Sequence, residues 1–270
     1  MKLTVLCDNN TIIDRYYLGE PALSFFLEEE DQKILFDTGY SDVFLRNAEK
    51  LGIDLSSLTA IVISHGHNDH TGGLRYLLNE TDLSGVKLIA HPGVFRRRRH
   101  EGLEIGAEVT AQECREHGLE VIETTAPYHL SEKLIYLGEI PRIVPFEAGT
   151  KIGRVFEEGK WKADYITDDS ALSYEGENGP FVITGCSHSG ICNILSYALK
   201  LSGRDQASGI IGGFHLLKQD EILEKTAAFL SEHVHKDLYP CHCVSLQAKL
   251  ALASKLPVTE IGSGSILEIL

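Results

Sequence analysis

The chain has 270 residues, of which 43% are hydrophobic and 24% are charged. This composition is typical of a globular protein with a substantial core, and it excludes a disordered or fibrous chain. No apolar stretch approaches the roughly 20 residues of a membrane span and no signal peptide is evident, so we expect a cytoplasmic protein without a membrane partner. The formal net charge of −14 disfavours nucleic acid as a partner.

Short strands alternate with amphipathic helices along the chain. The spacing of apolar residues predicts helices around residues 44–51, 191–199 and 222–230. Several strands precede the first of these helices, which favours a layered α/β sandwich with mixed sheets over a strictly alternating doubly wound fold. Residues 95–165 interrupt the pattern with Gly, Pro and charge, so we expect one domain, 1–270, with an inserted cap over 95–165. Strands are predicted at residues 3–6, 22–27, 33–36, 60–64, 86–90, 134–137, 181–184, 209–211 and 266–269.

Potential metal ligands are concentrated in residues 65–70, where a predicted buried strand gives way to a predicted helix that begins near Leu74. Imidazole nitrogen and carboxylate oxygen are both good zinc ligands, so His65 and His67 are candidates for one ion and Asp69 and His70 for a second. A solvated loop would not require this density of His and Asp. The sequence therefore predicts a metal-binding loop.

The predicted cap carries a basic run, Arg96-Arg97-Arg98-Arg99-His100. Such a run most often forms a solvated surface. The alternative is a role in binding phosphate or carboxylate, for which a guanidinium group is well suited. On this alternative, Arg96, Arg97 and Arg98 are candidate substrate-binding residues.

The loop resembles the His-x-His-x-Asp-His signature of the metallo-β-lactamase superfamily, and Thr71-Gly72-Gly73-Leu74 extends the likeness. The resemblance implies a four-layer αββα sandwich with mixed sheets and an active site with two divalent metal ions. We expect zinc, with iron or manganese as alternatives. Further motifs resemble the branch named after 7,8-dihydropterin-6-methyl-4-(β-D-ribofuranosyl)aminobenzene 5'-phosphate synthase: 36-FDTG-39, 185-GCSHSGI-191, 212-GGFHL-216 and 240-PCHC-243.

The resemblance also implies further ligands at later strand ends, and His188 and His242 are the candidates. Where the superfamily commonly places a Gly-Asp pair, this chain has Gly185-Cys186. Either His188 supplies the ligand there, which we favour, or Cys186 supplies it as a thiolate. On the first alternative, Cys186 behaves as a small buried residue beside the ligands.

Three other residues are assigned around the predicted ligands. Asp37 follows a strand and is expected to orient the metal-binding loop, because ligating histidines usually donate their second N–H to an acceptor. The resemblance implies a third histidine of the first site where this chain has Asp168 and Asp169, so that site either carries a carboxylate or lacks a ligand. We assign Asp168 to contact the ligands. His215 is a candidate ligand, proton donor or supporting residue at another strand end.

These residues together predict a metal-dependent hydrolase that activates water against an anionic small molecule such as a phosphoester, lactone or thioester. Asp69 and His215 are the candidate catalytic residues, the first orienting the nucleophile and the second protonating the leaving group. One alternative is a synthase of the kind that the name of the branch implies. Another is a metal-bearing ligand sensor with little turnover. Assembly into a homo-oligomer is left open.

Overall fold

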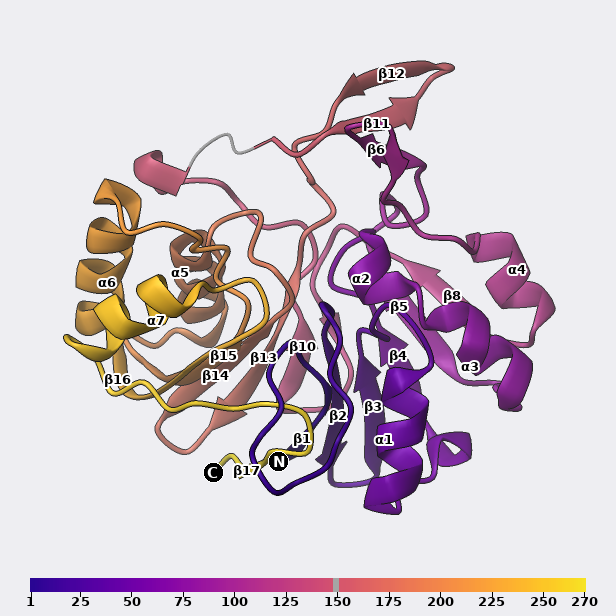
Figure 1. Cartoon of the computed structure of the whole chain (residues 1–270), viewed down its shortest axis with the longest axis horizontal. Helices are drawn as coiled ribbons and strands as arrows, with labels where there is room; N and C mark the ends of the chain where they lie inside the picture. Colours follow the sequence, from indigo (N-terminus) through magenta and orange to yellow (C-terminus); the bar gives the residue numbers. More distant parts are fainter. Residues whose placement is uncertain (148–150) are drawn as a thin grey trace. The chain divides into compact units, whose positions relative to one another are not determined.

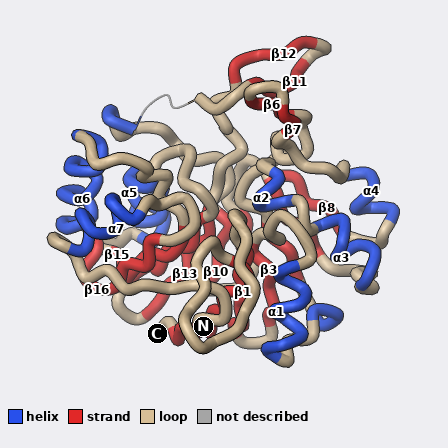
Figure 2. The backbone as a smooth tube through the Cα atoms, viewed as in Figure 1, coloured by secondary structure: helices blue, strands red, loops and turns tan. Residues whose placement is uncertain are grey.

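The computed structural model describes residues 1–147 and 151–270 (Figure 1). They divide into two compact units. Unit 1 consists of Met1–Thr125, Lys151–Asp168 and Gly262–Ile269. Unit 2 consists of Ala126–Thr150, Asp169–Ile261 and Leu270. Each unit contains a mixed β-sheet with helices on one of its faces (Figures 1 and 2).

Unit 1 is built on a seven-stranded sheet in the order β17-β1-β2-β3-β4-β5-β8. The strands from β17 to β3 pair antiparallel, whereas β3, β4, β5 and β8 run parallel to one another. The carboxyl ends of these parallel strands therefore meet at one edge of the sheet. The strands are β1 (Lys2–Cys7), β2 (Ser24–Glu29), β3 (Gln32–Phe36), β4 (Ala60–Val62), β5 (Lys87–Ala90), β8 (Glu120–Glu123) and β17 (Ile266–Glu268).

Helices α1 (Val43–Leu51), α3 (Leu74–Glu80) and α4 (Ala111–Glu116) cover one face of this sheet (Figure 1). The apolar core beneath them contains a row of side chains that the strand pairing places in register: Phe26, Leu35, Ile61 and Leu88. Successive side chains of a strand point to opposite faces of the sheet. The residues of this row therefore share the face that the helices cover, and they form a continuous apolar surface there.

A second, four-stranded sheet in unit 1 has the order β12-β11-β6-β7. Its strands are β6 (Arg98–His100), β7 (Leu103–Glu104), β11 (Arg154–Glu157) and β12 (Lys160–Ala163). The β6–β7 hairpin runs back toward the short helix α2 (Asn68–Thr71), where Gly106 forms an isolated β-bridge with His67.

Unit 2 is built on a six-stranded sheet in the order β16-β15-β14-β13-β10-β9. Its parallel strands β14, β15 and β16 end in register, with Thr184, Gly212 and Pro240 aligned. The loops that follow these strands therefore leave the sheet at the same edge. The strands are β9 (Tyr128–His129), β10 (Leu134–Tyr136), β13 (Ala171–Gly176), β14 (Gly179–Thr184), β15 (Ala207–Gly212) and β16 (Val234–Pro240).

One face of the unit 2 sheet packs against helices α5 (Ile191–Ser202), α6 (Glu221–His233) and α7 (Leu246–Ala253) (Figure 1). Val182, Ile210 and Leu238 form an in-register row on this face, within the same apolar cluster as the buried residues of all three helices. The packing of α5 and α6 follows from their apolar stripes.

Every strand and helix predicted from the sequence is present, with ends that differ by a few residues. The predicted cap, residues 95–165, is not uniform: β6, β7, β11 and β12 form the small sheet, β8 extends the large sheet of unit 1, and β9 and β10 belong to unit 2. Residues 148–150 of the predicted cap lie outside the described residues. A single domain with a cap stays a prediction.

None of the helices in the described residues has the length and apolar character needed to cross a membrane.

Gly212 provides a test of how the strand ends of unit 2 are held. Its φ is 130°, and a Cβ there would lie 2.0 Å from the carbonyl oxygen of Thr184 on the paired strand. We expect Gly212→Ala to lower the free energy of unfolding by about 2 to 4 kcal/mol, measured by urea denaturation. Gly203→Ala is the control, because Gly203 also has a positive φ but open space around it, and it should cost only about 1 kcal/mol. Equal costs would contradict the proposed close packing.

Candidate metal centre

The metal-binding loop of unit 1 begins where β4 ends, beside the end of the parallel strand β3. Asp37 directly follows β3 and is fully buried. Its carboxylate accepts hydrogen bonds from both the backbone N–H and the hydroxyl of Ser64, each at 2.7 Å. The start of the loop is therefore fixed by one buried carboxylate.

The same carboxylate orients His70. The Nδ1 atom of His70 lies 2.7 Å from an Asp37 oxygen, so His70 presents Nε2 as its remaining ligand atom. The Asp69 carboxylate lies 3.6 Å from that Nε2 atom. Two atoms each about 2.1 Å from a tetrahedral ion are about 3.4 Å apart, so this pair fits one ion. The backbone N–H and hydroxyl of Thr38 both donate to the carbonyl of His70 and hold the helical turn in place.

His65 and His67 form a second pair, with His65 Nε2 lying 3.1 Å from His67 Nδ1. The hydroxyl of Ser64 lies 3.0 Å from Nδ1 of His65 and occupies that side of the ring. Burial lowers the pKa of His67 from its ordinary value of 6.5 to about 4. His67 is therefore neutral near pH 7, which is the form of imidazole that binds a metal ion.

Asp168 and Arg98 hold the backbone between these two histidines. Asp168 accepts a hydrogen bond of 2.8 Å from the Gly66 N–H and pairs with Arg98, which also pairs with Asp164 at 2.8 Å. Arg98 is only 1% exposed. The expectation that Arg98 binds substrate must therefore be corrected, because its guanidinium group is buried and already bound to two carboxylates.

The other two predicted substrate-binding arginines lie nearer the surface. Arg96 pairs with Glu157, and the exposed Arg97 pairs with Glu104 at 3.3 Å. The Arg97 guanidinium also lies over the Trp161 ring, 5.6 Å from its centroid. Their role in binding substrate stays a prediction.

In unit 2, candidate residues lie on the loops that follow β14, β15 and β16. Three residues of these loops, Ser187, His215 and His242, have φ angles of 59°, 50° and 52°. Positive φ is unfavourable for residues other than glycine, and such conformations are enriched at functional sites. The loops are therefore held in conformations that the chain would not adopt by local preference.

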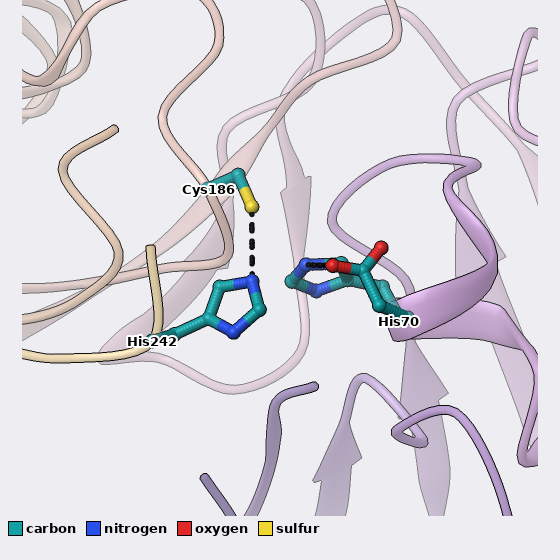
Figure 3. A group of neighbouring side chains, drawn as sticks. His70, Cys186 and His242 are labelled. Atoms are coloured by element: carbon teal, nitrogen blue, oxygen red, sulfur yellow. Dashed lines mark hydrogen bonds and ion pairs between the residues drawn. The ribbon is translucent and has the colours of Figure 1, made fainter. Parts of the chain in front are cut away.

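Cys186 and His242 come together at this edge (Figure 3). The Cys186 Sγ atom lies 3.2 Å from Nε2 of His242, and both residues are buried. A thiolate at about 2.3 Å and an imidazole at about 2.1 Å from one tetrahedral ion would be about 3.6 Å apart. The pair is thus close enough to share an ion.

His188 lies against a different histidine. Its ring centroid is 4.7 Å from that of His215. Asp169 accepts hydrogen bonds from the backbone N–H and the hydroxyl of the next residue, Ser189. The sequence suggested that His188 and Cys186 compete for one position, whereas the structure places each beside a different histidine.

Several residues that support these loops have no signal in the sequence. Asn193 on α5 accepts hydrogen bonds from the N–H groups of Ile143 and Val144 and donates to the Ser189 carbonyl. Glu147 accepts from two N–H groups in the first turn of α5. The contacts of Asn193 with Ile143 and Val144, and those of Glu147 with α5, span 45 to 50 residues of the chain, so no local motif predicts them.

The donor atoms in each unit suit a divalent transition metal. Imidazoles, a carboxylate and a thiol occur in pairs at 3.1, 3.6 and 3.2 Å. Imidazole and thiolate ligands together favour zinc or a neighbouring transition metal over magnesium or calcium. These side chains therefore fit the cofactor that the sequence predicts.

Comparison with known proteins agrees with the resemblance seen in the metal-binding loop. A model of the family described as the metallo-beta-lactamase superfamily matches residues 18–208. The uncharacterized protein MJ0448 of Methanocaldococcus jannaschii is 32% identical over 256 residues, covering 93% of both chains. The 7,8-dihydropterin-6-methyl-4-(beta-D-ribofuranosyl)-aminobenzene-5'-phosphate synthase of the same organism is 29% identical over 263 residues, covering 92% of this chain and 89% of that protein.

Among solved structures, Tm1679, a metal-dependent hydrolase of the beta-lactamase superfamily, is similar over nearly its whole length. It is 30% identical and superimposes with a TM-score of 0.85, covering 99% of this chain and 98% of Tm1679. The family model alone spans more than half of the chain. The α/β architecture with mixed sheets agrees with membership of this family. The chain therefore belongs to the metallo-β-lactamase superfamily.

Proposed function

We propose that the protein is a metal-dependent hydrolase that uses two divalent ions, most simply zinc, to hydrolyse a small anionic molecule. The observation that carries the proposal is the pairing of ligand atoms, because each of the three pairs described above has a separation that suits one ion. The similarity to Tm1679 over the whole chain supports the reaction class. A phosphoester, lactone or thioester is the proposed substrate class.

We assign His65, His67, Asp69 and His70 of unit 1, and Cys186, His188 and His242 of unit 2, as the ligands of the two ions. Bound ions would activate a water molecule and polarise the carbonyl or phosphoryl group under attack. Asp69 would orient that water through its carboxylate, and Asp37 would keep His70 in the required tautomer.

Two further roles complete the proposed mechanism. His215, whose ring lies against His188, is the proposed donor of a proton to the leaving group. Arg96 and Arg97 would attract the negative charge of the substrate through their guanidinium groups. The net charge of −14 argues against nucleic acid as the substrate.

A second candidate function is the synthase activity named for the Methanocaldococcus jannaschii relative, which is 29% identical to this chain. The substitution of Cys186 for an expected carboxylate favours neither candidate. Product analysis separates them, because a hydrolase adds water across a bond of one substrate whereas a synthase joins two reactants.

The central test is metal-dependent hydrolysis. We expect a panel of phosphoesters, lactones and thioesters to contain a substrate whose hydrolysis stops after chelation and returns with zinc. Asp69→Ala should remove most turnover, by at least about a hundredfold, because it removes a ligand that also orients water. The control Asp82→Ala alters an exposed turn and should leave turnover unchanged. Metal-independent turnover, or full turnover in Asp69→Ala, would refute the proposal.

The roles of Cys186 and His188 are tested with cobalt in place of zinc. If Cys186 is a ligand, the cobalt protein should show a sulfur-to-cobalt charge-transfer band that disappears in Cys186→Ser. Cys192→Ser is the control, because Cys192 is a buried thiol on α5. His188→Ala should lower the metal content but retain the band. Persistence of the band in Cys186→Ser would assign the thiolate to another cysteine, and absence of the band from the unsubstituted cobalt protein would exclude Cys186 as a ligand.

The buried imidazole of His67 predicts a pH-dependent stability of the metal-free protein. Because folding lowers its pKa to about 4, protonation favours the unfolded chain, and stability is lost as the pH falls from 6.5 toward 4. The shift corresponds to about 3 kcal/mol, which His67→Gln should remove from the pH dependence of urea denaturation. His100→Gln, at a half-exposed position, is the control. An identical pH dependence in His67→Gln and the unsubstituted protein would contradict this assignment.

A further inference from the structure

We propose that Arg98 is a positioning residue that sets the metal affinity of the His65 and His67 pair, acting through Asp168 and the backbone of Gly66. This inference rests on the proposed function, because it assigns His65 and His67 as ligands. Arg98 is the largest of the fully buried side chains, and it lies on β6, about thirty residues after the loop that it supports.

The guanidinium group of Arg98 is enclosed by acceptors. Its Nε atom donates to Asp164 at 2.8 Å, Nη2 donates to Asp168 at 2.5 Å, and Nη1 donates to the carbonyl of Val94 at 3.2 Å. A planar guanidinium with donors on three sides can fix two carboxylates in one geometry, which a lysine cannot do. The position of the Asp168 carboxylate is therefore set by Arg98.

Asp168 transmits this position to the metal-binding loop. One of its oxygens pairs with Arg98, and the other accepts the Gly66 N–H at 2.8 Å. Gly66 is the single residue between His65 and His67. A shift of this peptide would change the angle between the two imidazoles, whose ligand atoms are 3.1 Å apart.

Gly66 also lies directly against the guanidinium group. A Cβ on Gly66 would be 2.2 Å from Arg98 Nη1 and 2.1 Å from the Val94 carbonyl oxygen. Only glycine allows this approach, so the loop backbone packs directly against the Arg98 guanidinium group.

The backbone of β6 provides a second link to the same loop. The Ile105 N–H donates to the Arg98 carbonyl, and the Ile105 carbonyl accepts the Asn68 N–H, both at 2.9 Å. Figure 2 shows β6 and β7 above α2, and the isolated bridge between His67 and Gly106 joins them. Arg98 thus supports the loop on both sides of His67.

The charges explain why removing Arg98 should affect the loop. Burial raises the pKa of Asp164, and the nearby Arg98 opposes that rise. Without the guanidinium, two buried carboxylates would face each other without a cation, which is strongly unfavourable. The Asp168 carboxylate would then no longer be held in place, and the Gly66 N–H would lose the fixed position of its acceptor.

The test compares zinc affinities, measured by competition with a chromophoric chelator, among variants that remain folded. Arg98→Met and Asp168→Asn should each weaken zinc binding by about 10-fold to 100-fold, the usual effect of losing a residue that orients a ligand. Arg98→Lys should recover only part of the loss. The double variant should be no weaker than the worse single variant, because both act through the same Gly66 contact.

Two controls separate positioning from general stability. Arg99→Met alters the next residue on β6, which stacks on Trp161, and should bind zinc normally. Amide hydrogen exchange of Gly66 in the metal-free protein should accelerate in Arg98→Met and Asp168→Asn but not in Arg99→Met. If Arg98→Met does not fold, Asp168→Asn decides the outcome.

Normal zinc affinity and normal Gly66 exchange in a folded Asp168→Asn variant would overturn the inference. That outcome leaves the proposed function intact, because the unsubstituted protein would still bind zinc. Failure of the unsubstituted protein to bind zinc would instead refute the proposed function itself.

Discussion

The hydrogen bonds of Asp37 are the interaction on which the metal-binding loop depends. A single buried carboxylate accepts the N–H and hydroxyl of Ser64 and contacts Nδ1 of His70, each at 2.7 Å. It can do so because β3 and β4 run parallel and end side by side, which brings residues 37 and 64 together. A carboxylate that accepts from several donors holds them in one arrangement even when it is buried. The loop is thus held in a ligand-presenting conformation by the protein itself.

In unit 2, too, parallel strands that end side by side bring candidate ligands together. Thr184, Gly212 and Pro240 are aligned, and the residues beyond them include Cys186, His215 and His242. Positive φ angles at His215 and His242 are unfavourable, and they persist because the surrounding sheet and helices fix the loop ends. The packed core of unit 2 therefore maintains unfavourable backbone conformations at its strand ends.

Much of the fold was predictable, because the spacing of apolar residues along a strand or helix shows which of its faces is buried. In each unit the helices and the sheet bury these faces against one another. The β14 strand and the α5 helix have clear apolar patterns, whereas β16 (Val234–Pro240) is more polar and was not predicted. The metal-binding loop was also recognisable, because its four ligands lie within six residues. The environment of Arg98 was not, since pairing with Asp164 and Asp168 joins residues more than sixty positions apart. Local sequence made this arginine resemble a surface charge.

The most direct test of the account is a crystal structure of the zinc-loaded protein with anomalous diffraction measured at the zinc edge. We expect two anomalous peaks, with imidazole nitrogens of His65, His67, His70, His188 and His242 at about 2.0–2.1 Å and the Cys186 sulfur at about 2.3 Å. Peaks located away from these residues, or a His188 ring more than about 4 Å from either ion, would contradict it.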